Sequence, residues 1–350
     1  MRVALGLFRP PQRRSKGHLF PRHLLLCTAG VLGILCSWLA ASVSPAHAAN
    51  HFRSVITFGD SLTHNDILGA YYGNPQRLYG KDPMEAFFDK ASKPGDELVS
   101  FAVVGSKSRE LKAQIAAYLS AMKMEWIRKG TLFSIETGGN DLMDELHRLA
   151  QDPPGTRQST DRIVTRVVSA IRSASATLYK THPQARQIIW TLPDLTMIPK
   201  YWGDFSPQEQ QNIQAHISRA NRAIRRMSHG ARVIILDLYA VLKEVSETPP
   251  EILGHPLLGP PSWGQYDCIF ADRIHPTAVS NALIANKAIE TVELEWGKTI
   301  PPYSEGELAR LARIRKQSHW TDAPIEVFPE TSSRYAGPGI KVLRAVSPQN

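Results

Sequence analysis

Short apolar stretches alternate with longer amphipathic stretches along most of the chain. The short ones are rich in aliphatic and β-branched residues, and we expect them to form strands at 55–58, 98–103, 132–136, 187–192 and 232–236. The longer ones repeat apolar residues at helical spacing, which predicts helices over 108–124, 161–179, 206–227 and 277–296. Such alternation is typical of a parallel sheet with helices on both faces. The pattern therefore predicts a three-layer α/β/α sandwich with a central parallel sheet of about five strands.

The first 48 residues have a different composition from the rest of the chain. They contain six basic residues and no acidic one, and residues 24–43 are largely apolar. Ala46 and Ala48 give the small-x-small pattern of a signal-peptidase site. We therefore interpret 1–48 as a cleaved signal peptide. An uncleaved anchor is the alternative, because the apolar run approaches the length of a membrane span.

Removal of this segment changes the charge balance. The whole chain has 41 Lys and Arg against 32 Asp and Glu, but 35 and 32 follow Ala48, a net charge of about +3. A balance so near neutral gives no broad basis for binding nucleic acid. Cys268 is the single cysteine after Ala48, so we expect neither an intramolecular disulfide nor a cysteine metal cluster. The sequence also lacks Asn-x-Ser/Thr, and together these features favour a periplasmic or secreted bacterial protein.

Pro301 and Pro302 mark an expected boundary near the C-terminus. We expect one main domain over 49–300 and a C-terminal extension over 301–350. Within the extension, Ser304 and Glu307 have the spacing of a capping box. The extension is therefore expected to contain a short helix reaching Gln317, followed by an irregular tail.

Gly59, Asp60, Ser61 and Leu62 directly follow the first predicted strand. In open α/β sheets, ligands bind outside the carboxyl ends of the strands. Gly59 permits a sharp turn there, and the Ser61 hydroxyl would project above the sheet as a nucleophile. The Ser61 backbone N–H, at the start of a helix, would be free to bind an oxyanion. An ordinary helix cap is the alternative, and the tetrapeptide alone supports both interpretations equally.

Asp272 and His275 lie in one predicted loop before the last long helix. An aspartate three residues before a histidine can hold the imidazole in one tautomer, which leaves Nε2 to accept a proton from a serine. His64 is nearer to Ser61 in the sequence, but its candidate carboxylate partner at useful spacing is Asp66 alone. We therefore expect His275, oriented by Asp272, to be the base.

Two glycine-containing segments also follow predicted strands. Asn140 comes after Gly138 and Gly139 at the end of the third strand, where its side-chain amide can point into the same crevice as Ser61. Gly105 follows the second strand, where its backbone N–H can approach an oxyanion without a Cβ in the way. We expect an oxyanion hole made by Ser61, Gly105 and Asn140. Each segment is also a natural turn, so this interpretation depends on the combination.

The combination resembles the SGNH or GDSL hydrolase superfamily, of the exported bacterial esterase and lipase type. Its sequence blocks correspond here to residues 58–62, 102–105, 138–141 and 272–276, and the resemblance extends from Ser54 to Trp296. It implies a flavodoxin-like α/β/α fold and metal-free hydrolysis of esters through an acyl-serine. The sequence departs from the family pattern at two places. The glycine block often begins with asparagine, and here that position is Ser100. Lipase-type members often have Asp-x-Gly-Asn shortly after the serine, and here residues 63–66 replace it.

We therefore predict an exported serine esterase with Ser61, Asp272 and His275 as catalytic residues and no cofactor or metal. An acyltransferase, a lipid-directed lipase or phospholipase, and a non-catalytic envelope binding protein are the alternatives. The expected substrate is a small-molecule, polysaccharide or lipid ester, with no nucleic acid, no obligate protein partner and only transient membrane contact through the signal peptide. Four aromatic residues are candidates for lining a sugar or acyl site, although packing roles are the commoner alternative: Tyr71, Tyr72, Trp202 and Trp263.

Overall fold

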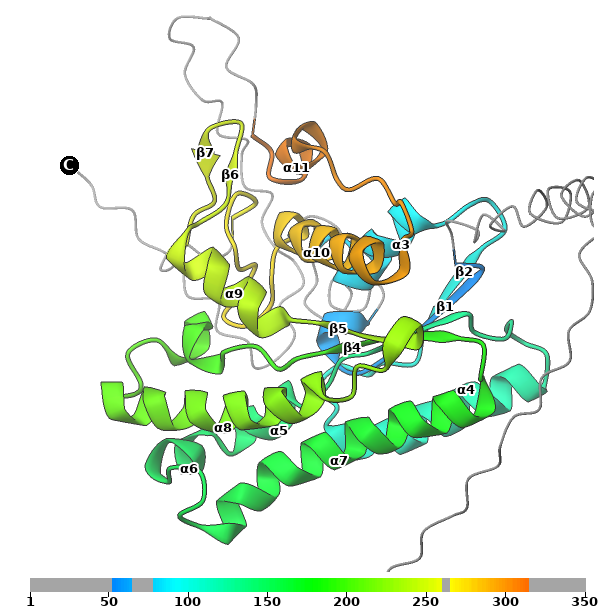
Figure 1. The fold of residues 1–350 in the computed structure, drawn as a ribbon. Coiled ribbons are helices and arrows are strands. Elements are labelled where there is room, and N and C mark those ends of the chain that lie inside the picture. The colour runs from blue at the N-terminus through cyan, green and yellow to red at the C-terminus, as the bar shows by residue number, and fades with distance from the viewer. Residues whose placement is uncertain (1–51, 65–77, 260–264, 315–350) are drawn as a thin grey trace, which may run out of the picture. The chain divides into compact units, whose positions relative to one another are not determined.

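The computed structural model describes residues 52–64, 78–259 and 265–314 (Figure 1). Within them one parallel sheet contains the strands β1 (Ser54–Phe58), β2 (Glu97–Ser100), β3 (Leu132–Ile135), β4 (Arg186–Trp190) and β5 (Val233–Leu236). Their spatial order is β2-β1-β3-β4-β5, the order of flavodoxin-like folds. The predicted parallel α/β fold is confirmed.

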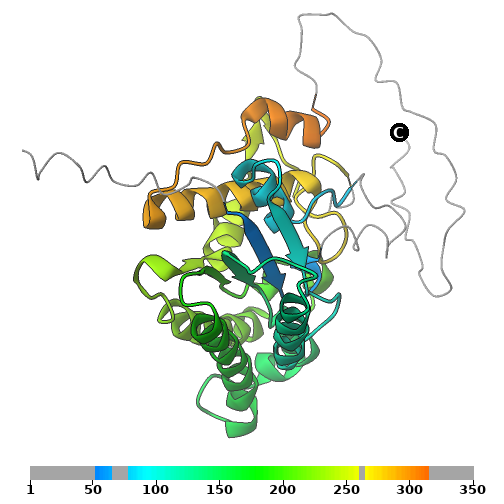
Figure 2. The same cartoon turned by 90° about the vertical axis from the view of Figure 1, so that its right-hand side faces the viewer.

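Helices cover both faces of this sheet (Figures 1 and 2). The helices α3 (Pro83–Ala91) and α10 (Ala278–Trp296) lie on one face, and α4 (Leu111–Lys123), α7 (Gln158–Thr181) and α8 (Pro207–Arg225) lie on the other. Successive strand residues point to opposite faces, so Val55 packs in the core with α3 and α10 whereas Ile56 packs in the core with α4 and α7. Both faces are apolar because both are buried.

Several boundaries differ from the sequence prediction. The second strand ends at Ser100 rather than at Val103, which is 54% exposed beyond the sheet edge. The helix expected from 108 begins as a 3-10 turn, η2 (Ser108–Glu110), before α4. Other elements were not predicted at all: α3, α5 (Gly139–Asp144), α6 (Leu146–Gln151), α9 (Leu238–Glu247) and the hairpin β6 (Glu251–Ile252) with β7 (His255–Pro256).

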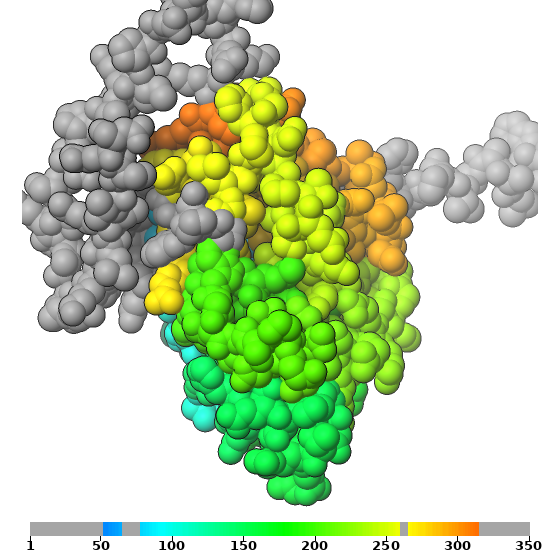
Figure 3. All heavy atoms as spheres, turned by 90° about the vertical axis from the view of Figure 1, so that its left-hand side faces the viewer, coloured from blue at the N-terminus to red at the C-terminus, as the bar shows by residue number. Residues whose placement is uncertain are grey.

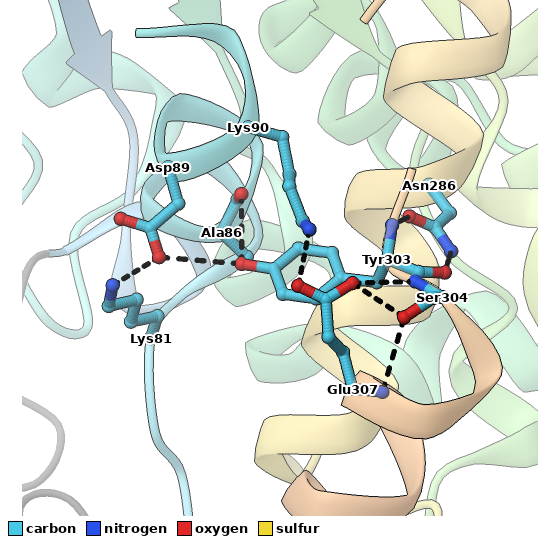
Figure 4. A network of polar contacts seen from close by, with 8 residues as sticks. All are labelled: Lys81, Ala86, Asp89, Lys90, Asn286, Tyr303, Ser304 and Glu307. Carbon is cyan, nitrogen blue, oxygen red and sulfur yellow. Dashed lines mark hydrogen bonds and ion pairs between the residues drawn. The ribbon is translucent and has the colours of Figure 1, made fainter. Parts of the chain in front are cut away.

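The described part of the C-terminal extension is held against α3 and α10 by the polar network in Figure 4. Asn286 on α10 pairs with both backbone groups of Tyr303, at 2.7 and 3.1 Å. The Tyr303 hydroxyl donates to the Ala86 carbonyl oxygen at 3.1 Å, and Lys90 pairs with Glu307 at 2.6 Å. The hydrogen bond from Lys90 is the main reason why the pKa of Glu307 falls to about 2.

Ser304 and Glu307 form the expected capping box at the start of α11 (Glu305–Leu311). The sequence prediction extended this helix to Gln317, which lies outside the described residues together with the rest of the tail. The proposed signal peptide at 1–48 also lies outside them. Among the described residues, no helix has the length and hydrophobicity needed to cross a bilayer.

Candidate functional site

The site forms where the strand order changes direction, at the carboxyl ends of β1 and β3. The turn after β1 leads into the 3-10 helix η1 (Ser61–Thr63), and Gly59 begins that turn with φ +147°. A Cβ at Gly59 would lie 1.8 Å from the Glu136 carbonyl oxygen, so only glycine fits this close approach. A crevice at such a switch point is the usual ligand site of an open α/β sheet.

Ser61 and His275 meet at this end of the sheet although 214 residues separate them in the chain. The Ser61 Oγ lies 2.9 Å from His275 Nε2, and His275 Nδ1 lies 2.7 Å from Asp272 Oδ2. Ser61 is 8% exposed and His275 is 4% exposed, so bulk water reaches neither side chain freely. The structure therefore brings together the nucleophile, base and orienting carboxylate expected from the sequence.

Asp272 is held by four donors. Its Oδ1 accepts from the backbone N–H groups of Ile274 and His275 at 2.6 and 2.7 Å. Its Oδ2 accepts from His275 Nδ1 and from the Tyr79 hydroxyl, the latter at 3.1 Å. Burial alone would raise the pKa of Asp272, but the hydrogen bond and charge interaction with His275 outweigh it, and the pKa lies below its ordinary value. The carboxylate is thus ionised and fixes the orientation of the imidazole.

The three expected oxyanion donors lie on adjoining turns. In the described part of the chain, the backbone N–H groups of Ser61 and Gly105 have no hydrogen-bond acceptor. Asn140 Nδ2 donates to Asp60 Oδ2 at 3.1 Å and to the Ser106 carbonyl oxygen at 3.0 Å. Both Asn140 N–H groups are therefore occupied, and a substrate oxygen would have to share or replace the Ser106 carbonyl.

Ser106 and Gln114, which the sequence analysis did not single out, fix the turn before the nucleophile. Gln114 accepts from the Gly59 N–H at 2.9 Å and donates to the Gly59 carbonyl oxygen at 2.8 Å. Ser106 Oγ donates to the same carbonyl oxygen at 2.7 Å. Gln114 is a polar residue on the buried face of α4, and this break in the apolar pattern is the signal that could have identified it.

Glu136 and Asp60 form a second unanticipated feature, a pair of buried carboxyl groups. Each is 3% exposed, and their side chains lie within hydrogen-bonding reach of each other. Burial raises the pKa of both groups, and that of Glu136 lies well above its ordinary value. An acidic residue at the end of a buried strand was the available sequence signal.

Two residues near the nucleophile have bracing contacts. Ser100 Oγ donates to the Thr63 carbonyl oxygen at 2.7 Å and accepts from Thr57 Oγ1 at 2.9 Å. The hydroxyl of Ser100 thus braces this loop, at the position noted in the sequence analysis as a departure from the expected pattern. His64 Nδ1 contacts the Ala102 carbonyl oxygen, which is a structural contact rather than a pairing with Ser61. Its possible partner Asp66 lies outside the described residues.

An apolar groove adjoins the catalytic residues. Leu62 follows Ser61, and Ile274 precedes His275; both line the groove. Its other walls come from the segment after β4, from α9 and α10, and from the chain around β6 and β7, with lining side chains such as Pro193, Leu238, Leu242, Val245, Leu257 and Leu283. Figure 3 shows this side of the molecule, where α9 and the β6–β7 hairpin (yellow-green to yellow) lie above α8 (green).

Of the four aromatic residues considered for a sugar or acyl site, the structure describes only Trp202. Trp202 is half-buried, and its indole N–H donates to the Met197 carbonyl oxygen at 3.2 Å. Tyr71, Tyr72 and Trp263 lie outside the described residues. Within the described ranges, no three His, Cys, Asp or Glu side chains gather in a cluster that could bind a metal ion.

Comparison with solved structures finds similar folds at low sequence identity. The lipase Lip_vut3 from a goat rumen metagenome is 16% identical over 68% of this chain and 96% of its own, with a TM-score of 0.46. The acetyl xylan esterase AlAXEase is 18% identical over 68% of this chain and 99% of its own, with a TM-score of 0.42. A lipolytic G-D-S-L family protein from Veillonella parvula is 18% identical over 68% and 96%, with a TM-score of 0.40.

A separate comparison with curated protein sequences finds no match. The family model of the GDSL-like lipase/acylhydrolases, in contrast, matches residues 55–288, which include the nucleophile turn, the Asn140 turn and the Asp272–His275 loop. This match covers most of the described domain. The chain therefore belongs to the GDSL-like lipase/acylhydrolase family of ester hydrolases.

Proposed function

We propose that the protein is a serine esterase that hydrolyses carboxylic esters through an acyl-serine intermediate. The contact of 2.9 Å between Ser61 Oγ and His275 Nε2 carries this proposal, because it aligns a nucleophile with its base. The bond of 2.7 Å to Asp272 supports it further, since it keeps the proton on Nδ1 and leaves Nε2 free to accept one.

In the proposed reaction, His275 takes the Ser61 proton as Ser61 Oγ attacks the ester carbonyl. The tetrahedral intermediate collapses when His275 returns this proton to the departing alcohol, which leaves the acyl group on Ser61. Water then loses a proton to His275 and attacks the acyl-serine. Collapse of the second intermediate releases the carboxylic acid and returns the proton to Ser61.

The oxyanion of both intermediates would be stabilised by the backbone N–H groups of Ser61 and Gly105 and by the Asn140 side chain. The two backbone donors have no acceptor among the described residues, so they are available to substrate. Asn140 would keep its bond to Asp60 and transfer its second N–H from the Ser106 carbonyl oxygen to the oxyanion.

The apolar groove supports an ester with an aliphatic acyl chain as the substrate. Its lining is almost wholly aliphatic, and it includes Leu62 and Ile274, which are next to Ser61 and His275 in the sequence. Each methylene buried there contributes about 0.8 kcal/mol of transfer free energy. We therefore expect selectivity to increase with acyl length until the groove is filled.

This expectation can be tested with aryl esters of graded acyl length, alongside acetylated xylan. Val245 lies two helical turns, about 10 Å, beyond Leu238 on α9, so a tryptophan there would block the distal part of the groove. Val245→Trp is expected to lower kcat/KM for octanoyl esters about tenfold, with less than about threefold change for acetyl esters.

Glu247→Trp is the matched control, because Glu247 is an exposed residue of the same helix outside the groove. It is expected to match the wild type at every chain length. Equal losses on acetyl and octanoyl esters in Val245→Trp would contradict the groove assignment. Product analysis with an added alcohol separates hydrolysis from acyl transfer, because a transferase would convert the alcohol into a new ester.

We also propose that the enzyme is exported and that its signal peptide is cleaved after Ala48. The basic start, the apolar stretch and the alanines at the boundary support this proposal. Expression of the full chain in a bacterial host is expected to yield an extracytoplasmic protein whose N-terminal residue is Ala49. A membrane-bound product that retains residues 1–48 would favour the anchor instead.

A further inference from the structure

We propose that Glu136 is a positioning residue of the oxyanion hole, a role that rests on the proposed esterase function. In its protonated form, Glu136 donates its carboxyl O–H to Asp60. Asp60 in turn holds the side-chain amide of Asn140 so that its N–H groups, rather than its oxygen, face the substrate. Glu136 touches no reacting atom and acts only through these two residues.

Glu136 lies directly after β3, at the seam with β1. Its backbone N–H donates to the Phe58 carbonyl oxygen at 3.1 Å, and its own carbonyl oxygen occupies the space beside Gly59. Its carboxyl is within hydrogen-bonding reach of both the side chain and the backbone N–H of Asp60. The buried carboxyl is thus held beside the residue that immediately precedes Ser61.

The hydrogen-bond partners of the pair distinguish the two carboxyl groups. Asp60 accepts from the Leu62 backbone N–H at 3.2 Å and from Asn140 Nδ2 at 3.1 Å. Glu136 Oε2 is buried and finds no donor among the described residues. A carboxylate oxygen buried without a donor is costly, whereas a protonated acid needs an acceptor, and Asp60 provides one. The geometry therefore assigns the proton to Glu136 and the negative charge to Asp60.

The surrounding charges favour this assignment. Burial raises the pKa of Glu136, and the negative charges of Asp60 and Asp82 raise it further. Burial also raises the pKa of Asp60, and Asp141 adds to this effect, whereas a backbone N–H, Glu136 and His275 lower it. Two ionised carboxylates within hydrogen-bonding reach would repel each other, so the pair of Asp60 and Glu136 retains one proton at neutral pH.

The charge on Asp60 determines which side of the Asn140 amide it binds. A carboxylate accepts hydrogen bonds and donates none, so it selects Nδ2 and excludes Oδ1. If Glu136 could not donate, Asp60 would lose a stabilising partner and would itself take up a proton more readily. A protonated Asp60 could bind Oδ1 instead, and the amide would then lose its orientation toward the oxyanion.

A double-mutant cycle tests this chain of contacts on the purified enzyme with an aryl ester. Glu136→Leu is expected to lower kcat about a hundredfold, with KM changed less than about threefold, because it removes the support of one oxyanion donor. In an Asn140→Ala background, the same change is expected to lower kcat less than about threefold, because the group that it orients is gone. Equal losses in the two backgrounds would overturn the proposal.

Glu136→Gln is the conservative variant, since its amide can still donate to Asp60, and we expect its kcat at neutral pH to stay within about threefold of the wild type. A hundredfold loss in Glu136→Gln would also overturn the proposal. Circular dichroism and thermal unfolding show whether each variant folds.

The pH dependence of kcat tests the role of Glu136 even if Glu136→Leu does not fold. Because the pKa of Glu136 is raised, the wild type keeps its donor at neutral pH and loses it as the pH rises through that pKa. Two adjacent carboxylates then repel each other, and this repulsion is expected to displace Asp60 from its bond with Asn140. The wild-type kcat is therefore expected to fall at alkaline pH, whereas Glu136→Gln keeps its kcat there. Coincident alkaline profiles would contradict the role of Glu136. Ester hydrolysis that did not require Ser61 would instead contradict the proposed serine esterase function. Failure of the Glu136 proposal and failure of the proposed function are therefore distinguishable.

Discussion

Ser61→Ala is expected to lower kcat on a short-chain aryl ester by roughly 10⁴- to 10⁶-fold while the fold is retained. Alanine removes only the hydroxyl oxygen that lies 2.9 Å from His275 Nε2, so His275 has no nucleophile to deprotonate. The remaining Cβ keeps the volume of the turn nearly unchanged. Initial rates with a p-nitrophenyl butyrate substrate, together with thermal unfolding, measure both parts of this expectation.

Ser246→Ala is the matched control for this substitution. Ser246 is an exposed serine on α9 whose hydroxyl donates to the Lys243 carbonyl oxygen, and it is not among the residues that line the groove. We expect its kcat and KM to equal those of the wild type. Wild-type turnover in a folded Ser61→Ala variant would remove Ser61 from the mechanism.

Asp272→Asn is expected to lower kcat by about 10⁴-fold with little change in folding. Asp272 Oδ1 accepts two backbone N–H groups, while Oδ2 accepts His275 Nδ1. Asparagine has a single acceptor oxygen, and the two backbone donors would hold it. Its NH2 group would then face Nδ1 and favour the tautomer with the proton on Nε2, which cannot accept the Ser61 proton.

Tyr79→Phe supplies the comparison for Asp272→Asn. It removes one hydroxyl donor to Asp272 Oδ2, at 3.1 Å, but leaves the acceptor atoms of the carboxylate intact. We expect a loss in kcat of about tenfold or less, because one hydrogen bond contributes about 0.5–1.5 kcal/mol. The ranking is checked from kcat of the wild type and the two variants measured at the same neutral pH. Similar kcat values for Asp272→Asn and the wild type would contradict the orienting role.

The strands β1, β3, β4 and β5 were predictable because each is a largely apolar run of mostly buried residues, whereas the edge strand β2 is only half-buried. The prediction of 98–103 went too far, because Phe101 and Ala102 continue the apolar pattern after the chain leaves the sheet. The helix α3 was missed although Asp82 and Glu85 form a capping box around Pro83. The short helix α5 was treated as a turn because Gly138 and Gly139 are typical of turns.

The parts of the candidate site that lie within a few residues of one another in the sequence were predictable. The loop from Asp272 to His275 and the turns at Ser61 and Asn140 could each be singled out as candidates from a few neighbouring residues, and their combination favoured a catalytic role. Tyr79 and Glu136 could not, because their roles arise from contacts across 193 residues and between two strand ends, respectively. Such pairings depend on the order of the strands, which the chain pattern alone does not specify.

Labelling with a fluorophosphonate tests the central claim most directly, because this reagent phosphonylates a serine only when a neighbouring base activates it. We expect one adduct per folded wild-type molecule, located by peptide mass spectrometry on Ser61. Asp272→Asn is expected to label far more slowly and Ser61→Ala not at all. No adduct on the folded wild type, or an adduct on a serine other than Ser61, would contradict the assignment of Ser61 as the nucleophile.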